Sequence, residues 1–320
     1  MAWCYPKNWW TMLDTPYKAQ VDLLIKILPI IDEEKVFALK GGTAINLFIR
    51  DLPRLSVDID LTYLPFDDRK TALQTITSSL RKIRGRIHRA ILNSTVNEVA
   101  QKDGTVAKLT VQTEEAQIKI EVNTIMRGHL FEPERYALSG AVQDAFEQFA
   151  EITVVSTAEL FGGKICAALD RQHPRDLFDV HFLLQNEELT ENIKYGFISA
   201  LLSHNRPIHE LLSPNLLDQR EAFEQQFVGM TNAPFTYDDF EITRNQLIEE
   251  IQKILTDEDM VFLISFAEGE PKWSFFPYEK LKKLPAIQWK LQNIQHLIKA
   301  NPEKNAVQKK ALLDKLAENN

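Results

Sequence analysis

Apolar positions in the first half of the chain follow the patterns of strands in a sheet with at least one buried face. Val36–Leu39 is a short apolar run that ends at a glycine pair, which predicts a buried strand followed by a turn. Residues 116–126 alternate instead, so that Ile118, Ile120 and Val122 share one face and charged side chains share the other. Further strands are predicted over residues 57–64, 87–98, 106–113 and 152–155.

Apolar residues spaced three and four apart predict helices between these strands and through the second half of the chain. The early helices are expected over residues 10–31, 43–51 and 67–83. Beyond Ser156 the pattern is helical, with a helix start at Pro174 and a cap pattern formed by Thr256 and Asp259, whose helix ends at Gly269.

Strands grouped early and helices grouped late indicate an α/β (α+β) fold, with a mixed sheet flanked by helices and strands that are mainly sequential neighbours. A length of 320 residues allows one large domain or two ordinary ones. The change of pattern predicts an α/β domain over residues 1–150 and a mainly helical domain over 151–320.

Composition narrows the class of protein. Apolar residues make up 44% and charged residues 26%, which is typical of a globular protein, and the net charge of −8 argues against charge-driven coating of nucleic acid. The two cysteines, Cys4 and Cys166, are too far apart in sequence to suggest a zinc site or a disulfide framework. No apolar run is long enough to span a membrane, and the N-terminus lacks the apolar core of a signal peptide. We therefore expect a cytoplasmic protein with no membrane partner.

The main candidate chemistry lies in two neighbouring motifs. Gly41-Gly42-Thr43 follows the first predicted strand and opens a helix, where backbone N–H groups can approach a phosphate closely. Asp58 and Asp60 lie two apart in the next strand, so both carboxylates point to one face. Each motif has a structural alternative: the glycines could form only a tight turn, and the aspartates could be a solvated pair at a strand edge.

The two motifs together favour a catalytic site. Two adjacent carboxylates repel each other, and Mg²⁺ (or Mn²⁺) relieves that repulsion while also binding the oxygens of a triphosphate. A phosphate cradle followed by a metal pair predicts nucleotidyl transfer from a nucleoside triphosphate (NTP).

These motifs resemble the first motif of the AbiEii/AbiGii toxin family, which are nucleotidyltransferase-like toxins of the polymerase-β superfamily related to the MenT toxins. Three later segments resemble the family's further motifs, in order along the chain: Lys119–Val122, Phe161–Leu169 around Lys164, and Arg175–Val180. The four motifs cover a little under half of the chain. The resemblance implies a nucleotidyltransferase-like fold with a mainly helical C-terminal half.

The resemblance also implies the remaining site residues. Glu121 is expected to be the third metal ligand or the general base, although its strand position equally suits a solvent-facing acid paired with Lys119. Lys164 is expected to meet the triphosphate, although a lone helical lysine often only reaches solvent. Asp176 is expected in the catalytic site, although an acid in the first turn of a helix also suits the helix dipole. Ser56 is expected at the edge of the site, aiding a phosphate or the turn.

A cluster of basic residues is the candidate contact for RNA. The cluster, with no acid inside it, consists of Arg81, Lys82, Arg84, Arg86 and Arg89. A charge run of this kind is also typical of a solvated surface, and that alternative stays open here.

The resemblance implies a metal-dependent toxin of a toxin–antitoxin or abortive-infection system that transfers a nucleotide to RNA, with the tRNA 3′ end as the expected acceptor. It also implies a cognate antitoxin. Two alternatives stay open: transfer to a protein or a small molecule, and an inactive protein that only binds nucleotide.

Overall fold

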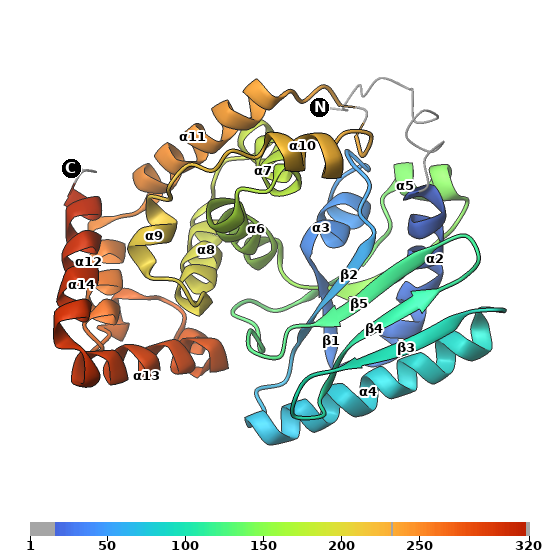
Figure 1. Ribbon diagram of the computed structural model, residues 1–320, viewed down its shortest axis with the longest axis horizontal. Helices are drawn as coiled ribbons and strands as arrows, with labels where there is room; N and C mark the ends of the chain where they lie inside the picture. Colours follow the sequence, from blue (N-terminus) through green and yellow to red (C-terminus); the bar gives the residue numbers. More distant parts are fainter. Residues whose placement is uncertain (1–16, 232, 318–320) are drawn as a thin grey trace. The chain divides into compact units, whose positions relative to one another are not determined.

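A computed structural model describes residues 17–231 and 233–317 (Figure 1). The first seven residues of the expected helix 10–31 lie outside this part of the chain. The described residues form two compact units. The first unit holds the residues up to Gly128 together with Glu132–Ser156 and Phe227–Pro234, and the second holds His129–Phe131, Thr157–Gln226 and the residues from Phe235 onward.

The first unit is built on a seven-stranded mixed sheet with the order β3-β4-β5-β2-β1-β7-β6. In chain order its strands are β1 (Phe37–Lys40), β2 (Asp58–Tyr63), β3 (Thr95–Ala100), β4 (Val106–Gln112), β5 (Gln117–Val122), β6 (Glu134–Ala137) and β7 (Glu151–Val154). Strands β3, β4 and β5 are sequential antiparallel neighbours, as expected. The parallel pairs β2–β5 and β1–β7 join strands far apart in sequence, so sequential order describes only part of the sheet. The mixed sheet with a helical second half confirms the predicted fold class.

The first unit also contains several helices. They are α2 (Tyr17–Asp32), α3 (Gly41–Ala44), the π-helical turn η1 (Ile45–Ile49), α4 (Arg69–Ala90) and α5 (Gly140–Phe146). Helix α2 packs on β1, β5 and β7, α4 packs on β3 and β4, and the two helices contact each other. Ile59, Leu109 and Ile120 are fully buried on their strands, whereas Asp60 and Glu121 alternate with them and point to the other face. The acidic pair therefore lies on the face away from the strands' apolar side chains.

The predicted boundary between the helix 67–83 and the strand 87–98 is wrong. Helix α4 continues to Ala90, and β3 starts only at Thr95. Ile76, Ile83 and Ile87 are fully buried along one helical stripe, so the core-facing pattern runs past Gly85 without a break. The sequence also gave no sign of β6, because this edge strand is mostly exposed and lacks apolar alternation.

The second unit is helical. Its elements are α6 (Thr157–Arg171), α7 (Pro174–Asn186), α8 (Glu191–Ser203), α9 (Ile208–Leu212), α10 (Arg220–Gln226), α11 (Tyr237–Ile254), α12 (Asp257–Ala267), the 3₁₀ turns η2 (Trp273–Phe275) and η3 (Glu279–Lys283), α13 (Pro285–Ala300) and α14 (Pro302–Ala317). The predicted cap at Thr256 is confirmed: its side chain accepts a hydrogen bond from the Asp259 backbone N–H, and the Asp259 side chain binds the Thr256 backbone N–H in return. Pro174 occupies the first turn of α7, as predicted.

Two glycines let α6 and α8 approach each other closely. A Cβ atom on Gly162 would lie 2.3 Å from the backbone of Gly196 and Phe197, and one on Gly196 would lie 2.2 Å from the Ala158 carbonyl oxygen. The packing of α6 against α8 therefore depends on direct backbone contact at these two glycines. No helix in the described part of the chain has the length and apolar character needed to cross a membrane.

Candidate active site

The glycine pair forms the link between β1 and α3. Gly41 has φ +78°, a conformation that L side chains rarely adopt. A Cβ atom at this position would lie 2.7 Å from Oδ2 of Asp60. Only glycine lets the backbone turn here while it lies against the Asp60 carboxylate, which connects the two predicted motifs in space.

Gly42 and Thr43 contact residues at the start of β2 and so hold the same turn against that strand. A Cβ atom on Gly42 would lie 2.6 Å from the Arg54 guanidinium and 3.0 Å from the Ser56 hydroxyl. The Thr43 hydroxyl lies 3.0 Å from the Ser56 hydroxyl and donates to the Asp58 carbonyl oxygen. The site residues predicted between Gly41 and Asp60 are therefore brought together within the first unit.

Arg54 was missed by the sequence reasoning. Its side chain is buried and donates to the Leu55 carbonyl oxygen while its guanidinium lies against Gly42. The signal in the sequence was a single arginine between Pro53 and Leu55, two positions before Ser56. Arg54 adds a buried positive charge beside the glycine turn.

Four charged residues lie in one row across four neighbouring strands. Lys40 of β1 is opposite Asp60 of β2, Asp60 is opposite Glu121 of β5, and Glu121 is opposite Lys108 of β4. Residues in register on neighbouring strands place their side chains on the same face of a sheet. The row therefore holds two acids in the middle and a lysine at each end. We call it the charged row.

Lys108, and not Lys119, is the ion-pair partner of Glu121. The Lys108 Nζ lies 3.1 Å from a Glu121 carboxylate oxygen, whereas Lys119 is opposite Asp58 in the register of β2 and β5. Both members of the Lys108–Glu121 pair are partly exposed, so this contact stabilises the fold only weakly.

The carboxylates suit a hard divalent cation, which takes oxygen ligands. Asp58 and Asp60 share a face of β2, and Glu121 is the neighbour of Asp60. Within residues 17–231 and 233–317, however, no three His, Cys, Asp or Glu side chains are gathered closely enough to form a metal site. The fit to a metal therefore rests on the chemistry of the two aspartates, and the ligand role of Glu121 stays a prediction.

A pocket of about 350 Å³ opens over the charged row. All four row residues line it, and so do Val99, Gln101, Asn123, Thr124 and Ile125. The Gln101 side chain lies 3.4 Å from the Thr124 hydroxyl. This pocket offers carboxylates, lysines and neutral hydrogen-bonding groups together, which suits a ligand that carries both phosphates and a polar base.

The predicted RNA cluster lies on α4, and the first unit neutralises most of its charge. Arg81 and Arg84 both pair with Glu98, and Lys82 and Arg86 both pair with Glu34. Arg86 makes a second ion pair, with Glu33. These pairs support the alternative of a solvated, internally balanced surface for this cluster.

Lys164 and Asp176 belong to the second unit, where they form a buried ion cluster. Lys164 Nζ lies 2.7 Å from Asp176 and 2.9 Å from Asp179, and all three side chains are buried. Arg171 also binds the Asp176 carboxylate. Burial by itself would raise the pKa of Asp176, but the charges of Lys164 and Arg171 outweigh it and hold that pKa well below its usual range. The alternative of an exposed, solvated lysine at 164 is wrong. The roles of both residues in catalysis stay predictions.

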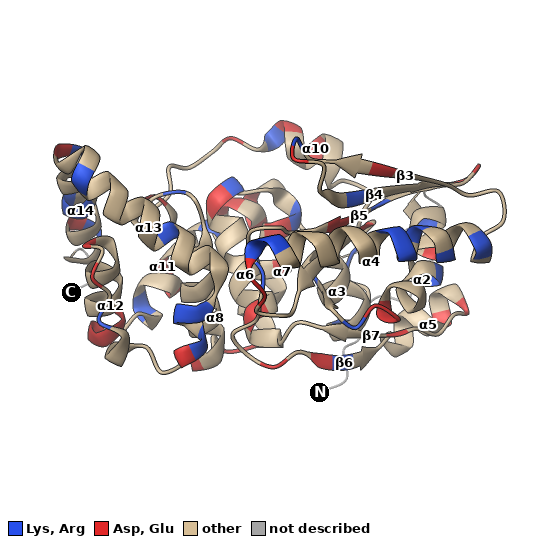
Figure 2. Cartoon of the chain, turned by 90° about the horizontal axis from the view of Figure 1, so that it is seen from below, with Lys and Arg blue, Asp and Glu red and all other residues tan. Residues whose placement is uncertain are grey.

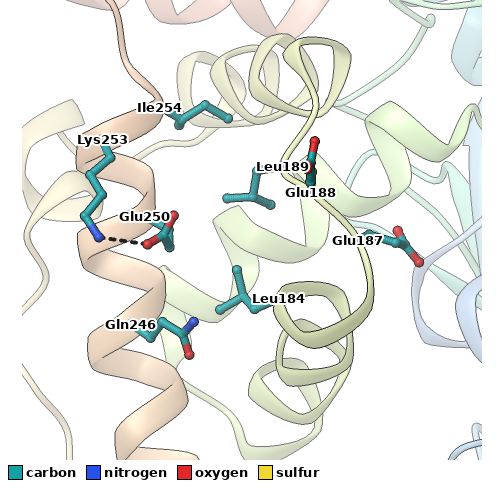
Figure 3. A pocket seen from close by; sticks show the side chains of 8 residues that line it. All are labelled: Leu184, Glu187, Glu188, Leu189, Gln246, Glu250, Lys253 and Ile254. Atoms are coloured by element: carbon teal, nitrogen blue, oxygen red, sulfur yellow. Dashed lines mark hydrogen bonds and ion pairs between the residues drawn. The ribbon is translucent and has the colours of Figure 1, made fainter.

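The second unit also contains a pocket of about 480 Å³ between the end of α7 and α11 (Figure 3). Leu184, Leu189 and Ile254 line it together with Glu187, Glu188, Gln246, Glu250 and Lys253. The only lysine in the lining pairs with Glu250 at 2.9 Å. The acidic lining would repel a triphosphate, so this pocket does not suit the nucleotide.

Comparison with known proteins assigns the chain to a protein family. Residues 22–293 match the sequence profile of a family described as the nucleotidyl transferase AbiEii toxin of a type IV toxin–antitoxin (TA) system. The chain belongs to the AbiEii family. It is therefore a nucleotidyltransferase toxin of a toxin–antitoxin system, as the resemblance implied, and the family description adds that the system is of type IV.

The chain shares its fold with a solved nucleotidyltransferase toxin. The nucleotidyltransferase toxin MenT4 from Mycobacterium tuberculosis H37Rv superposes with a TM-score of 0.58 at 14% sequence identity, over 87% of this chain and 93% of MenT4. A comparison with curated proteins gave no match. The family places this chain among the nucleotidyltransferases, which in general use an NTP and a divalent metal.

Proposed function

We propose that this AbiEii family member transfers a nucleotide from an NTP to an RNA acceptor, at the 3′ end of tRNA, in a metal-dependent reaction. The observation that carries the proposal is the approach of Gly41 to Asp60 beside Glu121. It brings a turn able to bind phosphate against carboxylates able to bind a cation, and Asp60 and Glu121 both line one pocket.

Asp58 and Asp60 would hold a Mg²⁺ or Mn²⁺ ion, with Glu121 as the candidate third ligand or as the base that accepts the proton of the acceptor hydroxyl. When bound, such an ion neutralises the triphosphate and lowers the pKa of an attacking hydroxyl. Lys108 already takes one oxygen of Glu121, so it would have to release the carboxylate or share it.

The residues of the chain supply positioning and charge. The backbone of Gly41–Thr43 and the Ser56 hydroxyl would orient the phosphates, and Lys40 at the end of the charged row would balance their negative charge. The pyrophosphate-binding role of Lys164 rests on the family resemblance. In the second unit, Asp176 and Asp179 lie 2.7 and 2.9 Å from its ammonium and hold it in place.

Two other functions compete with this one. An enzyme that modifies a protein or a small molecule would use the same pocket. A protein that only binds nucleotide would not need carboxylates on neighbouring strands, which are a cost to folding when no cation is present.

An end-transfer assay tests the proposal. Wild-type protein is mixed with Mg²⁺, each α-labelled NTP in turn, and total RNA, beside Asp58→Asn/Asp60→Asn. The control variant, Glu114→Gln/Glu115→Gln, loses two exposed carboxylates of the same unit outside the site. We expect label on tRNA-sized species with the wild type and the control variant. We expect no label with the aspartate variant. Labelled protein or small molecules in place of RNA would overturn the acceptor, and nucleotide binding without pyrophosphate release would overturn transfer itself.

A further inference from the structure

The last part of the second unit is basic although the whole chain is acidic. Between residues 279 and 315 there are nine lysines and three acids, whereas the chain has a net charge of −8. Helix α13 contains no aspartate or glutamate, so it carries blue but no red in Figure 2. Such a concentration of one charge sign on a short segment attracts a polyanion.

The lysines of this segment differ from the basic cluster on α4 in their pairing. On α4, four of the five basic side chains pair with glutamates. In the basic segment, Lys282 pairs with Glu279 and Lys309 with Glu268. Within the part of the chain that the structure describes, Lys283, Lys299, Lys304 and Lys310 form no ion pair. Their charge remains available to a ligand in solution.

One side of helix α13 is buried, and the opposite side is exposed and mostly polar. Its apolar side packs near Gly269, whose Cβ position lies 3.0 Å from Ile298, and Lys290 is buried and donates to three backbone carbonyl oxygens. The opposite side carries Trp289, Gln292, His296 and Lys299, at the spacing of one helical face. Trp289 is 60% exposed, which leaves most of a large flat ring in contact with water.

We propose that this side of α13 binds the RNA acceptor, an inference that rests on the proposed function. The α13 surface consists of the exposed side chains Trp289, Gln292, His296 and Lys299 of this side, with the exposed lysines Lys283 and Lys304 that precede and follow the helix in sequence. Lysines neutralise phosphates, an exposed indole stacks on an unpaired base, and amide and imidazole groups hydrogen-bond to base edges and riboses. A helix of 16 residues is about 24 Å long, enough to follow several phosphates of one strand.

A membrane surface or a protein partner fits these features less well. A helix that lies in a membrane needs a broad apolar face toward lipid, and the exposed side of α13 is polar apart from Trp289. A protein partner anchored on Trp289 alone would not need unpaired lysines before and after the helix.

Charge reversal in the full-length protein tests the inference. The surface variant is Lys283→Glu/Lys299→Glu/Lys304→Glu. The control variant is Lys18→Glu/Lys70→Glu/Lys102→Glu, which makes the same change in net charge at three exposed lysines of the first unit that form no ion pair within residues 17–231 and 233–317. Binding of fluorescein-labelled deacylated tRNA is followed by fluorescence anisotropy between 50 and 300 mM salt, and circular dichroism checks the fold.

The surface variant is expected to bind the labelled tRNA on the order of 30- to 100-fold more weakly than the control variant. Its slope of log K against log salt should be shallower by about 2, as for the loss of three phosphate contacts. Trp289→Ala should weaken binding about tenfold without a change of slope, and Trp289→Phe should restore most of it, because stacking needs an aromatic ring and no charge.

The outcomes separate this inference from the proposed function. A surface variant that binds tRNA within about twofold of the control overturns the α13 surface, even if the wild type still labels RNA. A wild type that binds tRNA through this surface but adds no nucleotide to any RNA overturns the proposed function and leaves the surface standing. In transfer assays, the surface variant should raise KM for tRNA and keep kcat, because no residue of the surface belongs to the catalytic pocket.

Discussion

The backbone of Gly41 lies so close to Asp60 that a single added methyl group would come within 2.7 Å of the carboxylate. This relationship joins a turn at the end of one strand to an acid in the middle of the next. It explains why glycine is required at position 41, whereas an ordinary turn would accept other residues there.

Gly41→Ala is expected to abolish most nucleotidyl transfer, because the methyl group must displace the Asp60 carboxylate from the pocket. Gly104→Ala is the matched control: Gly104 also has a positive φ, +83°, but open space surrounds its Cβ position. Both variants should lose roughly 1–2 kcal/mol of stability from backbone strain. Equal transfer activity in the two variants would contradict a catalytic position for Asp60.

Lys108→Met is expected to lower the Mg²⁺ concentration needed for half-maximal pyrophosphate release. The substitution frees the Glu121 carboxylate and removes a positive charge that competes with the cation. Since the ion pair is partly exposed, the effect should be modest, about two- to fivefold. Lys102→Met, at an exposed position beyond β3, should leave the Mg²⁺ dependence unchanged. An unchanged dependence in Lys108→Met as well would argue that Glu121 is not a metal ligand.

Asp176→Ala is expected to destabilise the protein by about 3–5 kcal/mol, because it removes one of the two carboxylates that pair with the buried Lys164 ammonium, Asp176 and Asp179. Urea denaturation measures this change, with the exposed Asp314→Ala as control. A loss below about 1 kcal/mol for Asp176→Ala would mean that the cluster contributes little to folding.

The same carboxylate predicts a dependence of stability on pH. The pKa of Asp176 is lowered in the folded state, so its contribution is fully present above its unfolded pKa of about 3.9 and is lost as the pH falls toward the folded pKa. Between about pH 5 and pH 2, the unfolding free energy of the wild type should therefore fall more steeply than that of Asp176→Asn. Parallel curves for the two proteins would show that this group does not account for acid sensitivity.

Gly162→Ala is expected to destabilise the second unit strongly, because the new methyl group would lie 2.3 Å from backbone atoms of Gly196 and Phe197 that cannot move aside alone. Gly163→Ala in the same helix is the control. Nothing lies within 4 Å of its Cβ position, so the better helix propensity of alanine should stabilise it by up to about 1 kcal/mol. Thermal unfolding followed by circular dichroism compares the two, and similar melting temperatures would contradict the close crossing of α6 and α8.

Helix starts and the strands of the central sheet were predictable because they depend on short-range chemistry. The cap formed by Thr256 and Asp259 is satisfied within four residues, and the alternation around Glu121 follows from the geometry of one strand. The boundary between α4 and β3 was not predictable in this way. Ile87 belongs to the buried stripe of the helix, but an isoleucine suits either structure until its neighbours in the core are known.

The order of residues alone contains the family motifs, the alternation that places Asp58 and Asp60 on one face, and the basic clusters. Which of these groups meet depends on how the chain folds. The fold pairs β5 with β2 and so sets Glu121 beside Asp60, and it reveals that Lys108 is the ion-pair partner. It also pairs four of the five basic residues on α4 with glutamates, whereas Lys283, Lys299 and Lys304 form no ion pair among the described residues. Charge and pattern are local properties of a sequence, whereas strand order and ion pairing depend on which distant segments pack together.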